Sequence, residues 1–220
     1  HEPFCHKGYR DFCYEVFSRF GVSEIVHIGD EVDNAALSYH ESMVEMPNAE
    51  SEAEQAQRAM EKWYETFPDV KVCVGNHSAL PFRKATTAGI PSRFMKTYEE
   101  IWNAPDGWKW DLAWEIDGVL YEHGTGSSGI SGARNRAVAN RQSTVVGHSH
   151  SFGGVSYMAS RNDLIFGLNV GCGIDVDHMA FSYGKNFPKK PTLGCGIVIN
   201  GGRTGIFVPM DLGRRNLYKF

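Results

Sequence analysis

Two histidines, His148 and His150, stand on alternate residues directly after an apolar run that is typical of a buried strand. The order of the segment is Val-Val-Gly-His-Ser-His-Ser, so only small residues flank the two imidazoles. Alternate residues of a regular strand point to opposite faces, so His148 and His150 cannot easily bind one ion from a strand. In a loop beside a pair of metal ions, each imidazole can bind a different ion. Neutral imidazole is a common ligand of divalent transition metals, so the segment indicates metal chemistry.

Other side chains that can ligate metals stand at the ends of further strand-like segments. They are found at His1, in Gly29-Asp30-Glu31-Val32-Asp33, in Gly75-Asn76-His77 and at His123. Each of these is a weak signal by itself, but open α/β sheets gather their loops at one edge, where the donors would meet. Mixed carboxylate, amide and imidazole donors suit Mn, Fe, Zn, Co or Ni, and the absence of paired cysteines argues against a structural zinc site.

The order of these motifs resembles the calcineurin-like metallophosphoesterase superfamily, whose signature runs D-x-H, G-D-x-x-D, G-N-H-[DE], H and G-H-x-H. The matching segments span nearly the whole chain and are Gly29-Asp30-x-x-Asp33, Gly75-Asn76-His77, His123 and Gly147-His148-x-His150. His1 looks like the histidine of the first motif, whose aspartate and strand would precede the given sequence. Ser78 stands where the family usually has an acidic residue, and we expect this change to alter the loop without removing the chemistry.

The resemblance implies a site with two divalent cations, manganese being the first expectation. The implied metal ligands are His1, Asp30, Asn76, His123, His148 and His150. Asp30 would bridge the two ions, with His1, His150 and the upstream aspartate on one ion and the remaining three residues on the other. The implied reaction is hydrolysis of a phosphate monoester or diester by a hydroxide that bridges the ions.

The same resemblance implies a proton donor and an orienting carboxylate. His77 would protonate the leaving alkoxide, and Asp33 would hold its imidazole. Arg134, Arg136 and Arg141 lie near the Gly/Ser-rich segment between His123 and His148, and their planar guanidinium groups suit phosphate oxygens. For each arginine, a solvated helix face is an equally good interpretation.

The composition excludes some partners and leaves other questions open. A net charge of -4 is too mild for an obligatory nucleic-acid or anionic-membrane partner, although a nuclease would use the same chemistry. The five cysteines are odd in number and contain no C-x-x-C pair, which predicts reduced thiols in a cytoplasmic protein. A binding scaffold that has kept the fold without catalysis is the alternative function. The substrate, the native metals and the oligomeric state stay undetermined.

The hydrophobic pattern predicts one α/β domain over residues 1–220. Helices are expected over 8–20, over 51–67 behind a capping box at Ser51 to Glu54, within 80–103 with breaks at 89–91, and over 133–140. Strands are expected over 24–29, 70–74, two within 108–122 that turn at Asp117-Gly118, and 144–146, 154–158, 164–170, 196–199 and 205–208. The resemblance implies a layered α/β/β/α sandwich of two mixed sheets flanked by helices, with the first strand missing from the given chain. His27 lies inside an apolar strand and is expected to be structural.

Overall fold

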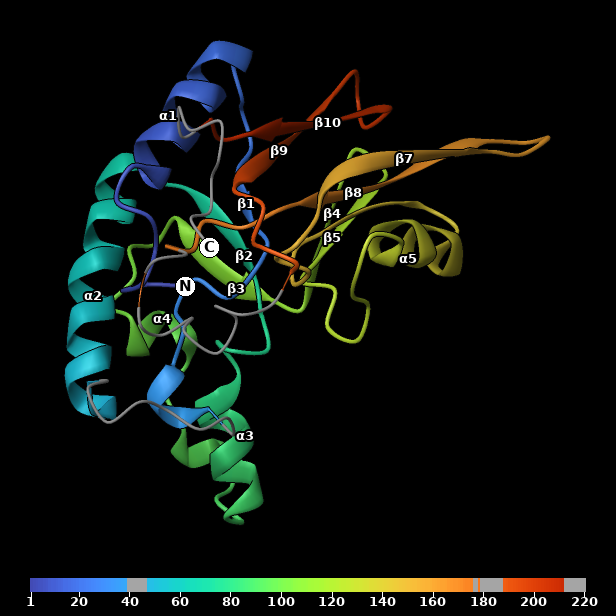
Figure 1. Cartoon of the computed structure of the whole chain (residues 1–220). Coiled ribbons are helices and arrows are strands. Elements are labelled where there is room, and N and C mark those ends of the chain that lie inside the picture. Colours follow the sequence, from blue (N-terminus) through green and yellow to red (C-terminus); the bar gives the residue numbers. More distant parts are fainter. Residues whose placement is uncertain (39–46, 176–177, 179–187, 212–220) are drawn as a thin grey trace.

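The α/β class is confirmed by a computed structural model, which describes residues 1–38, 47–175, 178 and 188–211. Helices α1 (Tyr9–Phe20) and α2 (Ala49–Thr66) lie on one side of the strands, and α5 (Gly132–Asn140) lies on the other (Figure 1). None of the described helices combines the length and the apolar character that crossing a bilayer requires.

The first sheet consists of three parallel strands in the order β1-β2-β3. These strands are β1 (Val26–His27), β2 (Val70–Cys73) and β3 (Trp108–Asp111). In the register of the sheet Val26 pairs with Lys71, and Val72 pairs with Trp110. Since all three strands run the same way, the loops that follow β1 and β2 leave from the same edge of the sheet.

The second sheet has five strands in the order β4-β5-β6-β8-β7. They are β4 (Ala113–Ile116), β5 (Val119–Glu122), β6 (Ser143–Val146), β7 (Gly153–Ala159) and β8 (Leu164–Val170). The central strands β5, β6 and β8 are parallel, while β4 and β7 are antiparallel edge strands. A separate antiparallel pair is formed by β9 (Gly194–Ile199) and β10 (Thr204–Pro209). The expectation of mixed sheets therefore holds for the five-stranded sheet, whereas the first sheet is wholly parallel in the described residues.

Helix ends follow the local capping chemistry. Gly21 follows α1 in the left-handed conformation (φ 61°), and the helix ends at Phe20, as the sequence predicted. The capping box expected at Ser51 is wrong, because the Asn48 side chain accepts a hydrogen bond from the Ser51 backbone N–H and α2 begins at Ala49. The segment after β2 forms α3 (Leu80–Thr87), the short 3₁₀ helix η2 (Ser92–Phe94) and α4 (Tyr98–Ile101), with breaks between them as expected.

The tryptophan-rich segment forms three strands instead of the expected two. Asp117 and Gly118 make the predicted hairpin turn between β4 and β5, both with positive φ (50° and 72°). The chain also breaks at Leu112, which is 75% exposed, and β3 on the other side of this break joins the first sheet. The break was missed because the alternating pattern continues through it while the chain changes sheets.

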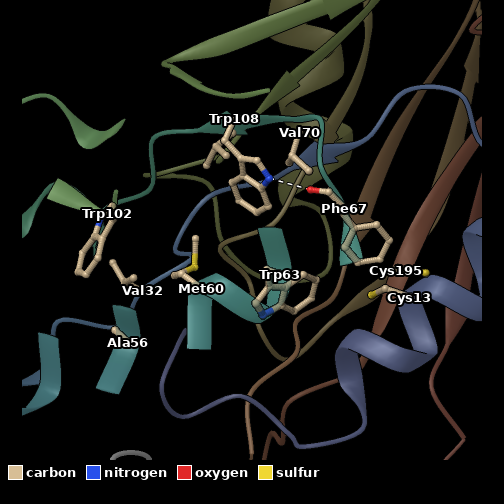
Figure 2. Close-up of a cluster of buried hydrophobic side chains, with 11 residues drawn as sticks. Cys13, Val32, Ala56, Met60, Trp63, Phe67, Val70, Trp102, Trp108 and Cys195 are labelled. Atoms are coloured by element: carbon tan, nitrogen blue, oxygen red, sulfur yellow. Dashed lines mark hydrogen bonds between the residues drawn. The ribbon is translucent and has the colours of Figure 1, made fainter. Parts of the chain in front are cut away.

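Two apolar clusters hold the layers together. Trp63 and Met60 of α2 pack against Val70 and Trp108 of the first sheet, and the Trp108 indole N–H donates to the Phe67 carbonyl at 2.7 Å (Figure 2). A second cluster joins the two sheets and contains Ile28, Cys73, Val119, Val145, Phe166 and Leu168. The two sheets are thus fixed to each other directly below the loops that follow β1, β2, β5 and β6.

Replacement of His27 tests the structural role expected for it. Its Nδ1 accepts a hydrogen bond from the Gly29 N–H at 3.2 Å, and burial lowers the pKa of the ring to about 3 from an ordinary value of 6.5. Between pH 6.5 and pH 3, His27 is protonated in the unfolded chain but not in the folded chain. The free energy of unfolding therefore decreases as the pH falls through this range. We expect His27→Asn to flatten the dependence of unfolding free energy on pH by up to about 1.4 kcal/mol per pH unit, measured by urea unfolding between pH 4.5 and 7. Equal slopes in the two proteins would contradict this assignment.

Candidate metal centre

Four loops bring the expected donors to one place. Asp30 follows β1, Asn76 follows β2, His123 follows β5 and His148 follows β6. His123 Nε2 lies 2.9 Å from Asn76 Oδ1 and 3.1 Å from Asp30 Oδ2, and His148 Nδ1 lies 2.8 Å from Asn76 Oδ1. Four of the predicted ligands therefore form one compact group.

His1 and His150 form a second group beside the first. Their Nε2 atoms are 3.0 Å apart, and His1 Nε2 is 3.9 Å from Asp30 Oδ2. The donor atoms of His1, Asp30 and His150 all lie within 4.8 Å of one another. Asp30 thus belongs to both groups, which is the arrangement expected of a ligand that bridges two ions.

The two carboxylate oxygens of Asp30 differ in their partners. Oδ1 accepts a hydrogen bond from the His77 backbone N–H at 2.8 Å. Oδ2 is buried, and within the described part of the chain no aligned hydrogen-bond donor meets it; its nearest neighbour is His123 Nε2 at 3.1 Å. A buried carboxylate oxygen without a partner is costly unless a cation or a proton meets it.

The hydrogen bonding of His123 makes the centre a cluster of acceptors. Its Nδ1 lies 2.7 Å from the Ile28 carbonyl, which can only accept, so Nδ1 carries the hydrogen. In the neutral ring, Nε2 then carries a lone pair, which faces Asp30 Oδ2 and Asn76 Oδ1. Burial disfavours charge on His123, but the nearby Asp30 carboxylate outweighs burial and raises the pKa of His123. A positive charge is therefore favoured at this point, as a proton or as a metal ion.

The donor spacing fits a transition metal. Ligands at about 2.0–2.2 Å from an ion, in tetrahedral or octahedral arrangement, lie roughly 2.8–3.6 Å from one another. The separations of 2.8, 2.9 and 3.1 Å around Asn76 and His123 fall in this range. Among the described residues, two groups of histidine and acidic donors have all their atoms within 4.8 Å of one another: His1, Asp30 and His150, and His1, Asp33 and His77. The ligand set expected from the sequence, with His123 and His148 on a second ion, stays a prediction.

Outer contacts orient the ligating rings. Asp33 Oδ1 lies 2.5 Å from His1 Nδ1 and so leaves His1 Nε2 turned to the centre. Burial lowers the pKa of His150 to about 4 and also lowers the pKa of His148. Both rings are consequently neutral at pH 7, which is the form that binds metal.

Backbone conformation at the centre is unusual. Asp30 and His148 have positive φ angles of 53° and 58°, a region that residues with a Cβ rarely adopt. Gly75 is required by close approach, because a Cβ at this position would lie 2.0 Å from Asp30 Oδ1. Strained backbone that the surrounding structure maintains is common at functional sites.

His77 and Asp33 are adjacent, but their contact differs from the expected one. His77 Nδ1 lies 2.7 Å from the Asp33 backbone carbonyl and 3.5 Å from its carboxylate. The carboxylate instead makes its closer contact with His1 at 2.5 Å. Asp33 therefore orients His77 through its main chain and His1 through its side chain.

The three arginines differ in their contacts, and their binding of substrate phosphate stays a prediction. Arg136 donates to Ser127 Oγ at 3.2 Å, to Glu122 Oε2 at 3.4 Å and to the Thr125 carbonyl. These bonds anchor the Gly/Ser-rich loop. Arg134 and Arg141 are exposed on α5 and at its end, and neither side chain bonds to a described residue of the centre.

Two functional neighbours were missed in the sequence. Glu31 lies within the loop from Asp30 to Asp33, where an acidic residue is expected to be exposed to solvent. In the structure it is buried and accepts a hydrogen bond from Ser78. Ser149 is also buried, and its Oγ accepts a hydrogen bond from the Gly129 N–H at 2.9 Å. The only available signal was that both residues lie inside the metal motifs.

The centre opens into a cavity of about 300 Å³ that His1, Asp30, His123, His148 and His150 line together with parts of α1, β1, β8 and β9. No protein-family model, curated protein or solved structure matches the chain significantly. The relation to the metallophosphoesterases therefore rests on the motif resemblance.

Replacement of Gly75 by alanine tests the close contact under Asp30. The added Cβ would meet Asp30 Oδ1 at 2.0 Å and the Asp30 backbone nitrogen at 2.4 Å. We expect a loss of about 1–3 kcal/mol in unfolding free energy, measured by urea unfolding, because the loop has to move. The matched control is Gly8→Ala, whose Cβ would have its nearest neighbour at 3.5 Å. Equal stability of the two variants would show that the contact is not tight.

Proposed function

We propose that the protein hydrolyses phosphate esters with the help of two divalent metal ions. The observation that carries this proposal is the set of inward-facing acceptors around the buried, unpartnered Asp30 Oδ2. Bound divalent cations would supply Lewis acidity, which neutralises phosphoryl oxygens and lowers the pKa of water. Mn is the first expectation and Fe, Zn, Co or Ni are the other candidates, because the donors are mixed oxygen and imidazole nitrogen.

The chain's own residues hold the ions and move a proton. His1 and His150 would hold one ion, Asn76, His123 and His148 the other, and Asp30 would contact both. All of these side chains except His1 come from loops that follow strands of the two sheets, and the N-terminus of His1 is hydrogen-bonded to the Glu31 carbonyl, so the donors are held in place before a ligand arrives.

His77 is the proposed proton donor to the leaving alkoxide. Its side chain is 26% exposed, compared with 7% for His1 and 4% for His123, so it is the most accessible of these three imidazoles. Its Nδ1–H is held by the Asp33 carbonyl, which leaves Nε2 to carry the transferable proton in the imidazolium form. General acid catalysis of this kind contributes typically about 10²–10⁴-fold.

The substrate class is a phosphate monoester or diester. Nucleic acid would need a broader basic surface, which the net charge of -4 does not favour.

The odd number of cysteines, all five of them free thiols, supports a cytoplasmic location as part of the proposal.

The test is metal-dependent hydrolysis. Protein treated with EDTA and reloaded with Mn, Fe, Zn, Co or Ni is assayed with p-nitrophenyl phosphate and bis(p-nitrophenyl) phosphate. We expect activity that requires metal, and a loss of at least about a hundredfold in Asp30→Asn and His148→Ala, because each variant removes a ligand.

Matched controls are Asp163→Asn, at the exposed start of β8, and His6→Ala, which lies outside the donor groups. Both should retain activity. Metal binding without turnover of either substrate would support the inactive scaffold instead. Unchanged activity in Asp30→Asn and His148→Ala would refute the site.

A further inference from the structure

Glu31 is a buried carboxylate that the proposed chemistry does not use. It is 1% exposed, accepts a hydrogen bond from Ser78 Oγ at 2.7 Å and another from the Trp110 indole N–H at 3.1 Å. No lysine or arginine within the described part of the chain forms an ion pair with it. Burying a carboxylate without a cation is costly, so its position calls for a reason other than stability.

The position of the Glu31–Ser78 contact supplies that reason. Glu31 directly follows Asp30, and Ser78 directly follows His77, which itself follows Asn76. The hydrogen bond therefore joins the loop after β1 to the loop after β2, directly after Asp30 in the first loop and two residues after Asn76 in the second. It acts together with two other bonds between these loops, from the His77 N–H to Asp30 Oδ1 at 2.8 Å and from Asn34 Nδ2 to the His77 carbonyl at 2.9 Å.

We propose that Glu31 and Ser78 are positioning residues, which hold Asn76 and His77 at the correct distance from Asp30. This inference rests on the proposed function. Trp110, on the third strand of the same sheet, fixes the other oxygen of the Glu31 carboxylate. One carboxylate thus ties together the ends of β1, β2 and β3, and residues that orient ligands in this way govern metal affinity.

The contact also accounts for Ser78, where the resembling family usually has an acidic residue. A carboxylate at position 78 would lie against Glu31, since Ser78 Oγ is only 2.7 Å from Glu31 Oε2. Two buried carboxylates at that distance repel each other strongly. A hydrogen-bond donor at position 78 and an acid at position 31 are therefore complementary.

Metal affinity of Ser78→Ala is the first test, with Ser143→Ala as the matched control. Ser143 is also buried and makes one hydrogen bond, from the Phe166 N–H at 3.2 Å, but it lies at the start of β6, away from the centre. Titration calorimetry with Mn²⁺ should show about 10–100-fold weaker binding in Ser78→Ala and unchanged binding in Ser143→Ala. Glu31→Gln should also weaken binding, and Glu31→Gln/Ser78→Ala should lose less than the product of the two single effects, because the residues act as a pair.

A second measurement needs no metal and separates this inference from the proposed function. Hydrogen exchange of metal-free protein should be faster over residues 75–79 in Ser78→Ala than in the wild type, and unchanged there in Ser143→Ala. Unchanged exchange in Ser78→Ala would overturn the positioning role whether or not the protein binds metal. If the wild-type protein binds no metal, but exchange is still faster in Ser78→Ala than in the wild type, the proposed function is refuted and the link between the loops remains supported. Wild-type metal affinity in Ser78→Ala would overturn the inference while the metal centre stands.

Discussion

The repulsion among buried acceptor atoms around Asp30 is the constraint on which the centre depends. No aligned hydrogen-bond donor among the described residues meets Asp30 Oδ2. The nearest ring nitrogen, His123 Nε2, carries a lone pair when the ring is neutral, because Nδ1 donates its hydrogen to the Ile28 carbonyl. Asn76 Oδ1 adds a third acceptor within 2.9 Å of that nitrogen. Such a group is costly in a folded protein unless a positive charge enters it, either as a proton on His123 or as a bound cation.

The scaffold maintains this group by joining two sheets below it. Parallel pairing of β1 with β2 and of β5 with β6 sends all four donor loops toward the same end of the molecule. The cluster of Ile28, Cys73, Val145 and Leu168 between the sheets prevents the two pairs of loops from separating. At the contact itself Gly75 lets one loop lie directly against the Asp30 carboxylate, which no side chain would permit. Packing energy from the core therefore offsets the strain that the positive φ angles of Asp30 and His148 impose.

The sequence predicted the secondary-structure elements well where one local rule was sufficient. The helix that ends before Gly21, the hairpin at Asp117-Gly118 and the strand-terminal positions of Asp30 and Asn76 follow from residue type and spacing. It failed where two signals competed or where distant residues decide the outcome. Asn48 replaced Ser51 as the helix cap because both residues are good caps, and the break at Leu112 depends on which sheet each strand joins.

The same limit applies to side-chain partners within the centre. Motif spacing placed Asp33 next to His77, but it could not show that the Asp33 carboxylate turns to His1 while only its carbonyl meets His77. Likewise, Glu31 stands at a position marked x in the G-D-x-x-D signature, and Ser78 departs from the G-N-H-[DE] signature. Neither residue alone indicates that the two side chains are in contact. The structure joins the two side chains by a 2.7 Å hydrogen bond, so a carboxylate at position 78 would lie against the Glu31 carboxylate. Residue type and spacing therefore predict which side chains gather at the candidate centre, whereas the hydrogen bonds between its loops become visible only in the folded chain.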